Sequence, residues 1–240
     1  QTIIYLCAKF HPDPSTGLKV CINYMNHTVY SIKLVNIPGD KTNAIIRPCP
    51  THDVNCIRRF FAHNSYCTPS YGPTPDPYPI ERLIMPVPNA NLTFIWNNAL
   101  AKGLKDAVIT EFYINKETNR LVLEIEVPTF SVFSPGSIAR YHRKGKEPIE
   151  LTDYSFITYR MLSLTMVVPF VDAIQIDRAE VYTYIGVPTP VPLFSDPEIQ
   201  RSYNMMLDNI SITMREAFIV QAPLHMSVFI ETTICSFKQL

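Results

Sequence analysis

Residues 103–133 read GLKDAVITEFYINKETNRLVLEIEVPTFSVF, and this stretch predicts a β-hairpin. Apolar side chains occupy alternate positions in 108–114 and again in 121–127, on either side of a polar turn at 115–119. Glu124 and Glu126 fall on the opposite face of the second strand. A strand with one apolar and one charged face has water on one side and an apolar layer on the other.

The chain before this hairpin predicts further β-structure and one helix. Two β-prone runs within 18–36 predict a second hairpin, with Asn26 near its turn. Asp53 is a good cap for a short helix over 54–63. The proline-rich segment 69–79 predicts a stiff, extended linker between the amino-terminal part and the sheet.

Three more strands are predicted in the body of the chain. The first contains the alternating residues of 92–96, and the last covers 181–187. Between them, 151–168 is rich in β-branched and aromatic residues, but its apolar face changes phase after Met161. This change of phase predicts a bulge, or a strand that is buried on both faces.

The last predicted element is a long helix that starts at Pro197. Asp196 is a capping residue, Pro197 suits the first helical position, and Glu198 puts an acid in the first turn. An apolar stripe follows at spacings of three and four: Ile199, Tyr203, Met206, Ile210, Met214 and Ala217. Pro223 is expected to kink or interrupt the helix, and the helical signal over 224–237 is weak.

The composition excludes several classes of function. With 21 Lys and Arg against 21 Asp and Glu, the chain has no overall charge that would attract nucleic acid or an anionic membrane. Its seven glycines leave little material for phosphate-binding loops, and no catalytic motif is present. We therefore expect a non-enzymatic protein without a cofactor or a metal. No run of residues is long and apolar enough to span a membrane, so we expect no contact with the interior of a membrane. The oligomeric state stays open.

Cysteines and sequons point to secretion. Six cysteines and three N-x-S/T triplets favour an oxidising, extracellular destination. Asn26 and Asn91 are the candidate glycosylation sites, whereas Asn209 falls in a predicted helix that should be largely buried. The first residue, Gln1, suits a mature end left by signal cleavage.

Three motifs together carry a family resemblance: GLK followed by I-x-E-F and a hairpin, CPTHDVNC at Cys49–Cys56, and DPYPIERL from Asp76. In this order they resemble the takeout and juvenile hormone binding protein family, which are secreted insect carriers of small hydrophobic molecules. The resemblance covers roughly residues 47–237. It implies an α+β fold in which a highly curved antiparallel sheet wraps a long carboxy-terminal helix and encloses an elongated hydrophobic tunnel. The expected domain is 47–240, with 1–46 as an extension packed on it.

The resemblance also implies a function, namely transport of a terpenoid, a fatty acid or a carotenoid-like molecule in the tunnel. The implied wall residues are Tyr159, Ile157, Met161, Trp96, Phe94, Leu123, Ile125, Phe133, Met206 and Ile210. Tyr159 would hold the ligand's polar end, or would be a core tyrosine bonded to a backbone carbonyl. The alternative function is a surface-active or structural secreted protein that exposes the apolar face of its helix.

Cysteine pairing follows in part from the resemblance. Cys49 and Cys56 match the short disulfide loop of the family, and this is preferred to a metal site that would include His52. A second family disulfide would fall at Tyr182 and Val220, where this chain has no cysteine. The other four cysteines allow three pairings, of which the local Cys7–Cys21 together with Cys67–Cys235 is favoured.

Overall fold

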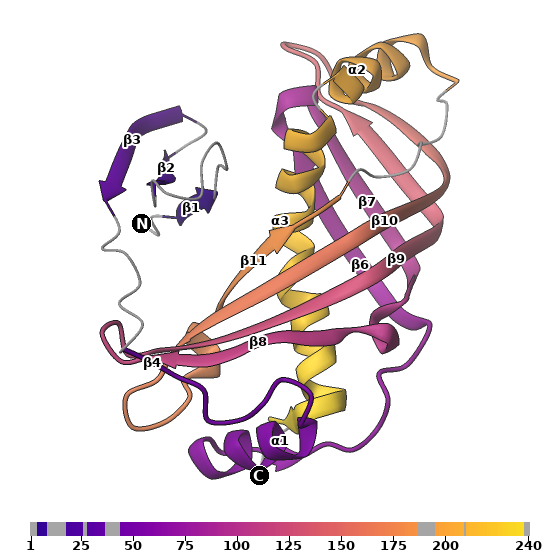
Figure 1. Cartoon of the computed structure of the whole chain (residues 1–240). Coiled ribbons are helices and arrows are strands. Elements are labelled where there is room, and N and C mark those ends of the chain that lie inside the picture. The colour runs from indigo at the N-terminus through magenta and orange to yellow at the C-terminus, as the bar shows by residue number, and fades with distance from the viewer. Residues whose placement is uncertain are drawn as a thin grey trace. The chain divides into compact units, whose positions relative to one another are not determined.

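The structure of the chain is a computed structural model (Figure 1). It describes residues 4–8, 18–25, 28–36, 44–186, 195–208 and 210–237, and it describes the side chains of 44–186, 195–205 and 218–237. The chain divides into two compact units, Gln1–Ile45 and Ile46–Leu240. Each unit is described by itself below.

The first unit contains a three-stranded antiparallel sheet in the order β1-β2-β3. Its strands are β1 (Ile4–Ala8), β2 (Leu18–Met25) and β3 (Thr28–Asn36). Strands β2 and β3 pair as the predicted hairpin, and Cys7 lies opposite Cys21 in the register of β1 and β2. Asn26 lies outside the described residues. That residues 1–46 pack on the body stays a prediction.

The second unit begins at the boundary strand β4 and holds the remaining elements. They are β4 (Ile45–Ile46), α1 (Val54–Asn64), β5 (Thr68–Pro69), β6 (Tyr78–Val87), η2 (Pro88–Ala90), β7 (Leu92–Lys102), η3 (Leu104–Asp106), β8 (Val108–Asn115), β9 (Arg120–Tyr141), β10 (Ile149–Pro169), η4 (Ile176–Arg178), β11 (Glu180–Tyr184), α2 (Pro197–Asp208), α3 (Ile210–Phe229), the π-helix η5 (Ile230–Ile234) and β12 (Cys235–Ser236).

The body is a curved antiparallel sheet around the carboxy-terminal helix, as the sequence predicts. Its main path runs β11-β10-β9-β7-β6, and β8 pairs with β9 alongside this path. Figure 1 shows the long strands crossing α3, which runs along the inner side of the sheet. Side chains from the inner faces of β6 to β10 form one hydrophobic core with Phe218, Ala222 and Met226 of α3. The α+β fold class is therefore confirmed.

The two longest strands change phase together. In β9 the buried side chains are at odd positions up to Val127, at even positions from Phe130 to Ser134, and at odd positions again at Ser137 and Ala139. In β10 they are at odd positions up to Tyr159 and, apart from Ser163, at even positions from Leu162. The change occurs at the partner pair Thr129 and Arg160, next to Met161, whose φ is 55°. The predicted irregularity in 151–168 is confirmed, and it involves both strands.

Two glycines pack against the place where β9 and β10 change phase together, which we term the double kink. A Cβ on Gly103, whose φ is 107°, would overlap the carbonyl oxygen of Thr129. A Cβ on Gly186 would overlap the carbonyl oxygen of Arg160. The kink is therefore enclosed from both sides by backbone that leaves no room for a side chain.

The helix starts agree with the sequence prediction better than the helix ends do. Asp53 caps α1 by accepting a hydrogen bond from the amide of Cys56 at 2.9 Å. The predicted helix from Pro197 is split into α2 and α3, with residue 209 outside the described residues. Pro223 is expected from the sequence to kink or interrupt the helix. An interruption is excluded, because α3 continues to Phe229, and a kink at Pro223 stays a prediction. Pro223 is exposed, and the buried side chains on either side of it hold the helix against the sheet.

Candidate functional site

Tyr159 lies in an aromatic cluster inside the body. Its ring stacks on Phe130 with centroids 6.4 Å apart and meets Phe218 edge-on at 4.9 Å. Both contacts come from inward-facing positions, Phe130 from β9 and Phe218 from α3. Burial raises the pKa of Tyr159 and a hydrogen bond with Gln221 lowers it, with a net rise. The side chain is therefore neutral, and its role as the anchor of a ligand's polar end or as a core tyrosine stays a prediction.

A short polar chain connects this cluster to the first long strand. Gln221 and His225 lie one turn apart on α3, and Oε1 of Gln221 is 3.5 Å from Nε2 of His225. Nδ1 of His225 hydrogen-bonds the hydroxyl of Tyr78, and Nε2 of Gln221 donates to the sulfur of Met85. These contacts fit the tautomer with a proton on Nε2, so that Tyr78 donates to Nδ1. Burial lowers the pKa of His225 to about 3, so this ring is neutral.

Five of the predicted wall residues share the inner face with Tyr159 or lie close to it. Leu123 and Ile125 of β9 are fully buried, and Trp96 of β7 and Ile157 of β10 are also buried. Phe94 is partly buried and packs on the core. All five therefore belong to the buried interior of the body or pack on it, and their role as walls of a tunnel stays a prediction.

Two predicted wall residues are wrong. Met161 is 71% exposed and Phe133 is 38% exposed. Both follow from the kink, because the alternation that places Tyr159 inside is broken at Met161, and Phe133 alternates with the buried Val132 and Ser134. The side chains of Met206 and Ile210 lie outside the described residues, so their place in the wall stays a prediction.

Sequence reasoning missed the helix side of the cluster. Phe218, Gln221, Ala222, His225 and Met226 are all buried, at spacings of three, one, three and one. This is the spacing of an inward helix face, and it was detectable in the sequence. It was overlooked because Pro223 lies in its middle.

Small polar residues interrupt the inner face above the cluster. Ser134 and Ser137 of β9 and Ser155 of β10 are buried. Trp96 of β7 is the register partner of Ser137, and Ser155 is the partner of Ser134. We term these four residues the polar belt. Trp96 belongs to the main core, and a second cluster contains Ile199 and Tyr203 of α2.

The outer face of the same strands carries an exposed apolar row. Leu100 of β7 pairs with Phe133 of β9, which pairs with Phe156 of β10. Leu100 and Phe156 are 41% and 52% exposed. Tyr154, also exposed, precedes Phe156 by two residues. We term Leu100, Phe133 and Phe156 the outer row.

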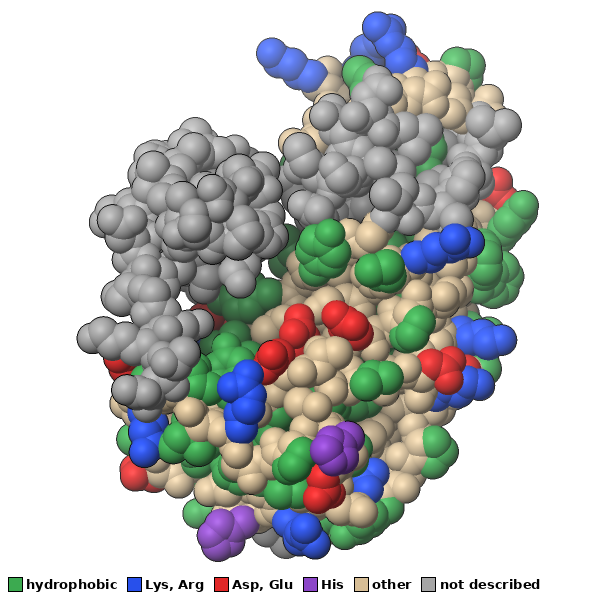
Figure 2. Space-filling model, viewed as in Figure 1, with side chains coloured by type: hydrophobic (Ala, Val, Ile, Leu, Met, Phe, Trp, Pro, Cys, Tyr) green, Lys and Arg blue, Asp and Glu red, His purple; other side chains and the backbone are tan. Residues whose placement is uncertain are grey.

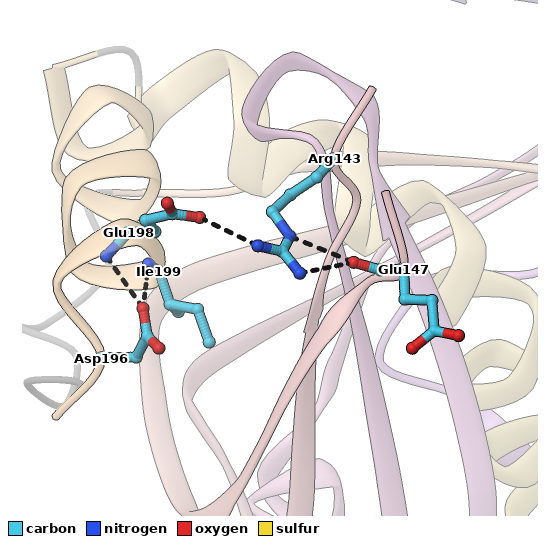
Figure 3. A network of polar contacts seen from close by, with 5 residues as sticks. All are labelled: Arg143, Glu147, Asp196, Glu198 and Ile199. Carbon is cyan, nitrogen blue, oxygen red and sulfur yellow. Dashed lines mark hydrogen bonds and ion pairs between the residues drawn. The ribbon is translucent and has the colours of Figure 1, made fainter. Parts of the chain in front are cut away.

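The turn between β9 and β10, residues 142–148, is rich in basic residues and contacts α2. Arg143 donates to the carbonyl oxygen of Glu147 from two nitrogens, at 3.0 and 2.8 Å, and lies 3.8 Å from a carboxylate oxygen of Glu198 (Figure 3). Asp196 caps α2 by accepting hydrogen bonds from the amides of Glu198 and Ile199. On the face shown in Figure 2, basic and acidic side chains are interspersed, which agrees with the balanced charge.

Two disulfides fix the ends of the body. Cys49 pairs with Cys56, as predicted, and Cys67 pairs with Cys235. The second bond joins the start of the body to β12, which pairs with β5. Asn91 is exposed and has a left-handed conformation after η2, so its side chain is accessible.

Two kinds of feature are absent from the described residues. Among them, no cluster of three or more His, Cys, Asp or Glu side chains has the arrangement of a metal site. None of the described helices combines the length and the apolar character needed to span a membrane.

Comparisons with known proteins give the family. The solved structure of Takeout 1 from Epiphyas postvittana has a TM-score of 0.40 and 13% identity, over 78% of this chain and 91% of that chain. Fibrohexamerin from Galleria mellonella is 25% identical over 217 residues, which are 87% of this chain and 96% of that protein. The family model described as Fibroin P25 matches residues 45–239. This corrects the expected family but leaves the confirmed fold class unchanged, and the chain belongs to the Fibroin P25 family.

Proposed function

We propose that this chain is a secreted, non-enzymatic protein that associates with fibroin. The family description names fibroin, and the family model covers the whole body of the chain. The two disulfides support an oxidising destination. Of the two functions expected from the sequence, this is the structural one. The exposed apolar surface, however, lies on the sheet and not on the helix.

The outer row is the observation that carries this proposal. Its three apolar side chains come from adjacent strands and lie side by side across the sheet. Rows of this kind on a solvent-facing sheet mark contact surfaces, because apolar area left in water is unfavourable. Covering the row would remove on the order of 200 Å² of apolar surface from water, which is about 5 kcal/mol before the costs of association.

Binding to solubilised fibroin tests the proposal. The variant Phe133→Ser with Phe156→Ser removes most of the row without touching the interior, and it should weaken binding at least tenfold. Tyr66→Ser is the matched control, since Tyr66 is an exposed aromatic residue outside the sheet. Equal binding by the double variant and the wild type would refute the role of the row. Absence of binding by the wild type would refute the association itself.

A second function is favoured by a separate observation. The polar belt contains buried hydrogen-bond donors without partners, which suits a bound molecule in the interior. We therefore also propose that the body carries a small hydrophobic ligand between the sheet and α3, in a tunnel of the kind that the resemblance implies. Extraction of the purified protein with organic solvent, followed by mass spectrometry, should release a stoichiometric apolar compound. An extract without one would contradict transport and leave the fibroin proposal intact.

A further inference from the structure

Two buried donors in the polar belt have no partner. Within the part of the chain whose side chains are described, neither Nε1 of Trp96 nor Oγ of Ser155 has a hydrogen-bond partner. Trp96 is 1% exposed and Ser155 is 7% exposed, so water does not reach them freely. A buried donor left unpaired costs about 1–3 kcal/mol, and such groups are rare in folded proteins. Two in one belt indicate that another molecule completes them.

Both residues face the interior. Trp96 alternates with Phe94 and Leu92, and Leu92 is buried against α2. Ser155 alternates with the buried Ile157 and Tyr159. The strands that carry them, β7 and β10, are separated only by β9. On β9 the belt continues through Ser134, which already donates to the carbonyl oxygen of Asn97 at 3.2 Å.

The chemistry of the belt selects one kind of ligand group. An indole N–H is a donor only, so its partner must be an acceptor. The belt itself contains three serines and one tryptophan, and its neighbours on the same face, Phe94 and Ile157, are apolar. No cation in this set would compensate a buried carboxylate, which is costly to bury alone. The acceptor that fits is uncharged.

We infer that the polar belt binds an apolar molecule through a neutral carbonyl oxygen, such as that of a long-chain ester or ketone, with Trp96 and Ser155 as donors. This inference rests on the second proposed function, transport of a hydrophobic ligand. It names the polar group of the ligand and the residues that hold it.

The single tryptophan makes the belt directly observable. Since Trp96 is the only tryptophan in the chain, its fluorescence reports this position alone. The protein, freed of endogenous lipid, is titrated with methyl palmitate, with hexadecane and with palmitate. Methyl palmitate should shift the emission of Trp96 and bind more tightly than either of the other two probes.

The variant Ser155→Ala should weaken binding of methyl palmitate by about 2- to 13-fold, which corresponds to one lost hydrogen bond, and should leave hexadecane unaffected. Ser163→Ala is the matched control: Ser163 is on the same strand and 8% exposed, but it donates to Glu124 on the outer face. If Ser155→Ala does not fold, Trp96→Phe is tested instead, by displacement of anilinonaphthalene sulfonate.

The outcomes separate the two levels of the proposal. If none of the three probes binds, the carrier function fails and the inference fails with it. If hexadecane binds as tightly as methyl palmitate, or Ser155→Ala binds the ester unchanged, the carrier function stands and the belt is not its polar site. If palmitate binds most tightly, the acceptor is charged and the neutral carbonyl is excluded.

Discussion

The carboxylate of Asp76 accepts a hydrogen bond from the backbone amide of Gly103 at 2.8 Å. Its second oxygen is 3.1 Å from the ammonium nitrogen of Lys105 in an ion pair. Two of the three motifs that carried the family resemblance, the Asp-Pro step and the GLK turn, are therefore in contact. Asp76 holds the turn after β7 against the segment that leads into β6.

Replacing Asp76 by Ala should destabilise the body by about 2 kcal/mol at neutral pH, because a buried hydrogen bond to a charged group is lost. Burial of Asp76 raises its pKa, but the amide of Gly103 and the ammonium of Lys105 together hold the pKa below its usual value. The stabilisation is thus complete above the unfolded value near ~3.9 and is lost as the pH falls through the folded value. Urea unfolding at pH 7 and pH 3 measures this.

The control for this prediction is Asp172→Ala, at an exposed aspartate in the segment after β10. It should leave the free energy of unfolding within about 0.5 kcal/mol of the wild type at both pH values. An effect of Asp76→Ala that is equally large at pH 3 would show that the lost packing matters and that the charge does not.

Alanine at Gly103 or Gly186 should destabilise the body by about 3 kcal/mol or more, because the added methyl group collides with a backbone carbonyl that cannot move aside. Gly136→Ala is the matched control, since its Cβ would meet only atoms of Asn97 at 4.0 Å. Thermal unfolding of the three variants compares them. Equal melting temperatures would show that the double kink relaxes without cost.

The two disulfides should differ in their contributions. Cys67 and Cys235 are separated by 168 residues, and Cys49 and Cys56 by 7. The loop-entropy model gives about 5 kcal/mol for the long loop and about 2 kcal/mol for the short one. Replacing each pair by serines and measuring urea unfolding tests the order. A larger loss from the short loop would mean that native strain, and not chain entropy, dominates.

The sequence was sufficient for elements whose signals are local. The hairpin around 115–119, the cap at Asp53 and the start of α2 each depend on residues within a few positions of one another. It was insufficient where two strands change conformation together. The alternation predicts that Met161 shares the face of Tyr159, because it cannot show that Arg160 and its partner Thr129 break phase as a pair.

The helix around Pro223 was underestimated for a related reason. A proline removes one backbone donor, but this cost is local, whereas the benefit of burying Gln221, Ala222, His225 and Met226 comes from strands far away in the sequence. The prediction of the candidate site was therefore incomplete. Its strand side, with Tyr159 and Trp96, was predicted, and its helix side was not.

His225 should make the protein sensitive to acid. Its ring is completely buried, and its contacts on β6, β9 and α3 are Tyr78, Phe130, Gln221 and Phe218, none of which carries a negative charge. Burial lowers the pKa of His225 to about 3, against about 6.5 in the unfolded chain. Between these values only the unfolded chain binds the proton, so stability falls as the pH falls from about 6.5.

The loss at pH 4.5 should be on the order of 2–3 kcal/mol relative to pH 7. His225→Gln removes the titrating group, so the free energy of unfolding of this variant should change less between the two pH values. This holds even if its free energy of unfolding at pH 7 is lower than that of the wild type. His63→Gln, at an exposed histidine of α1, should retain the dependence of the wild type. If wild type and His225→Gln lose equal stability on acidification, protonation of His225 is not what weakens the contact between α3 and the sheet.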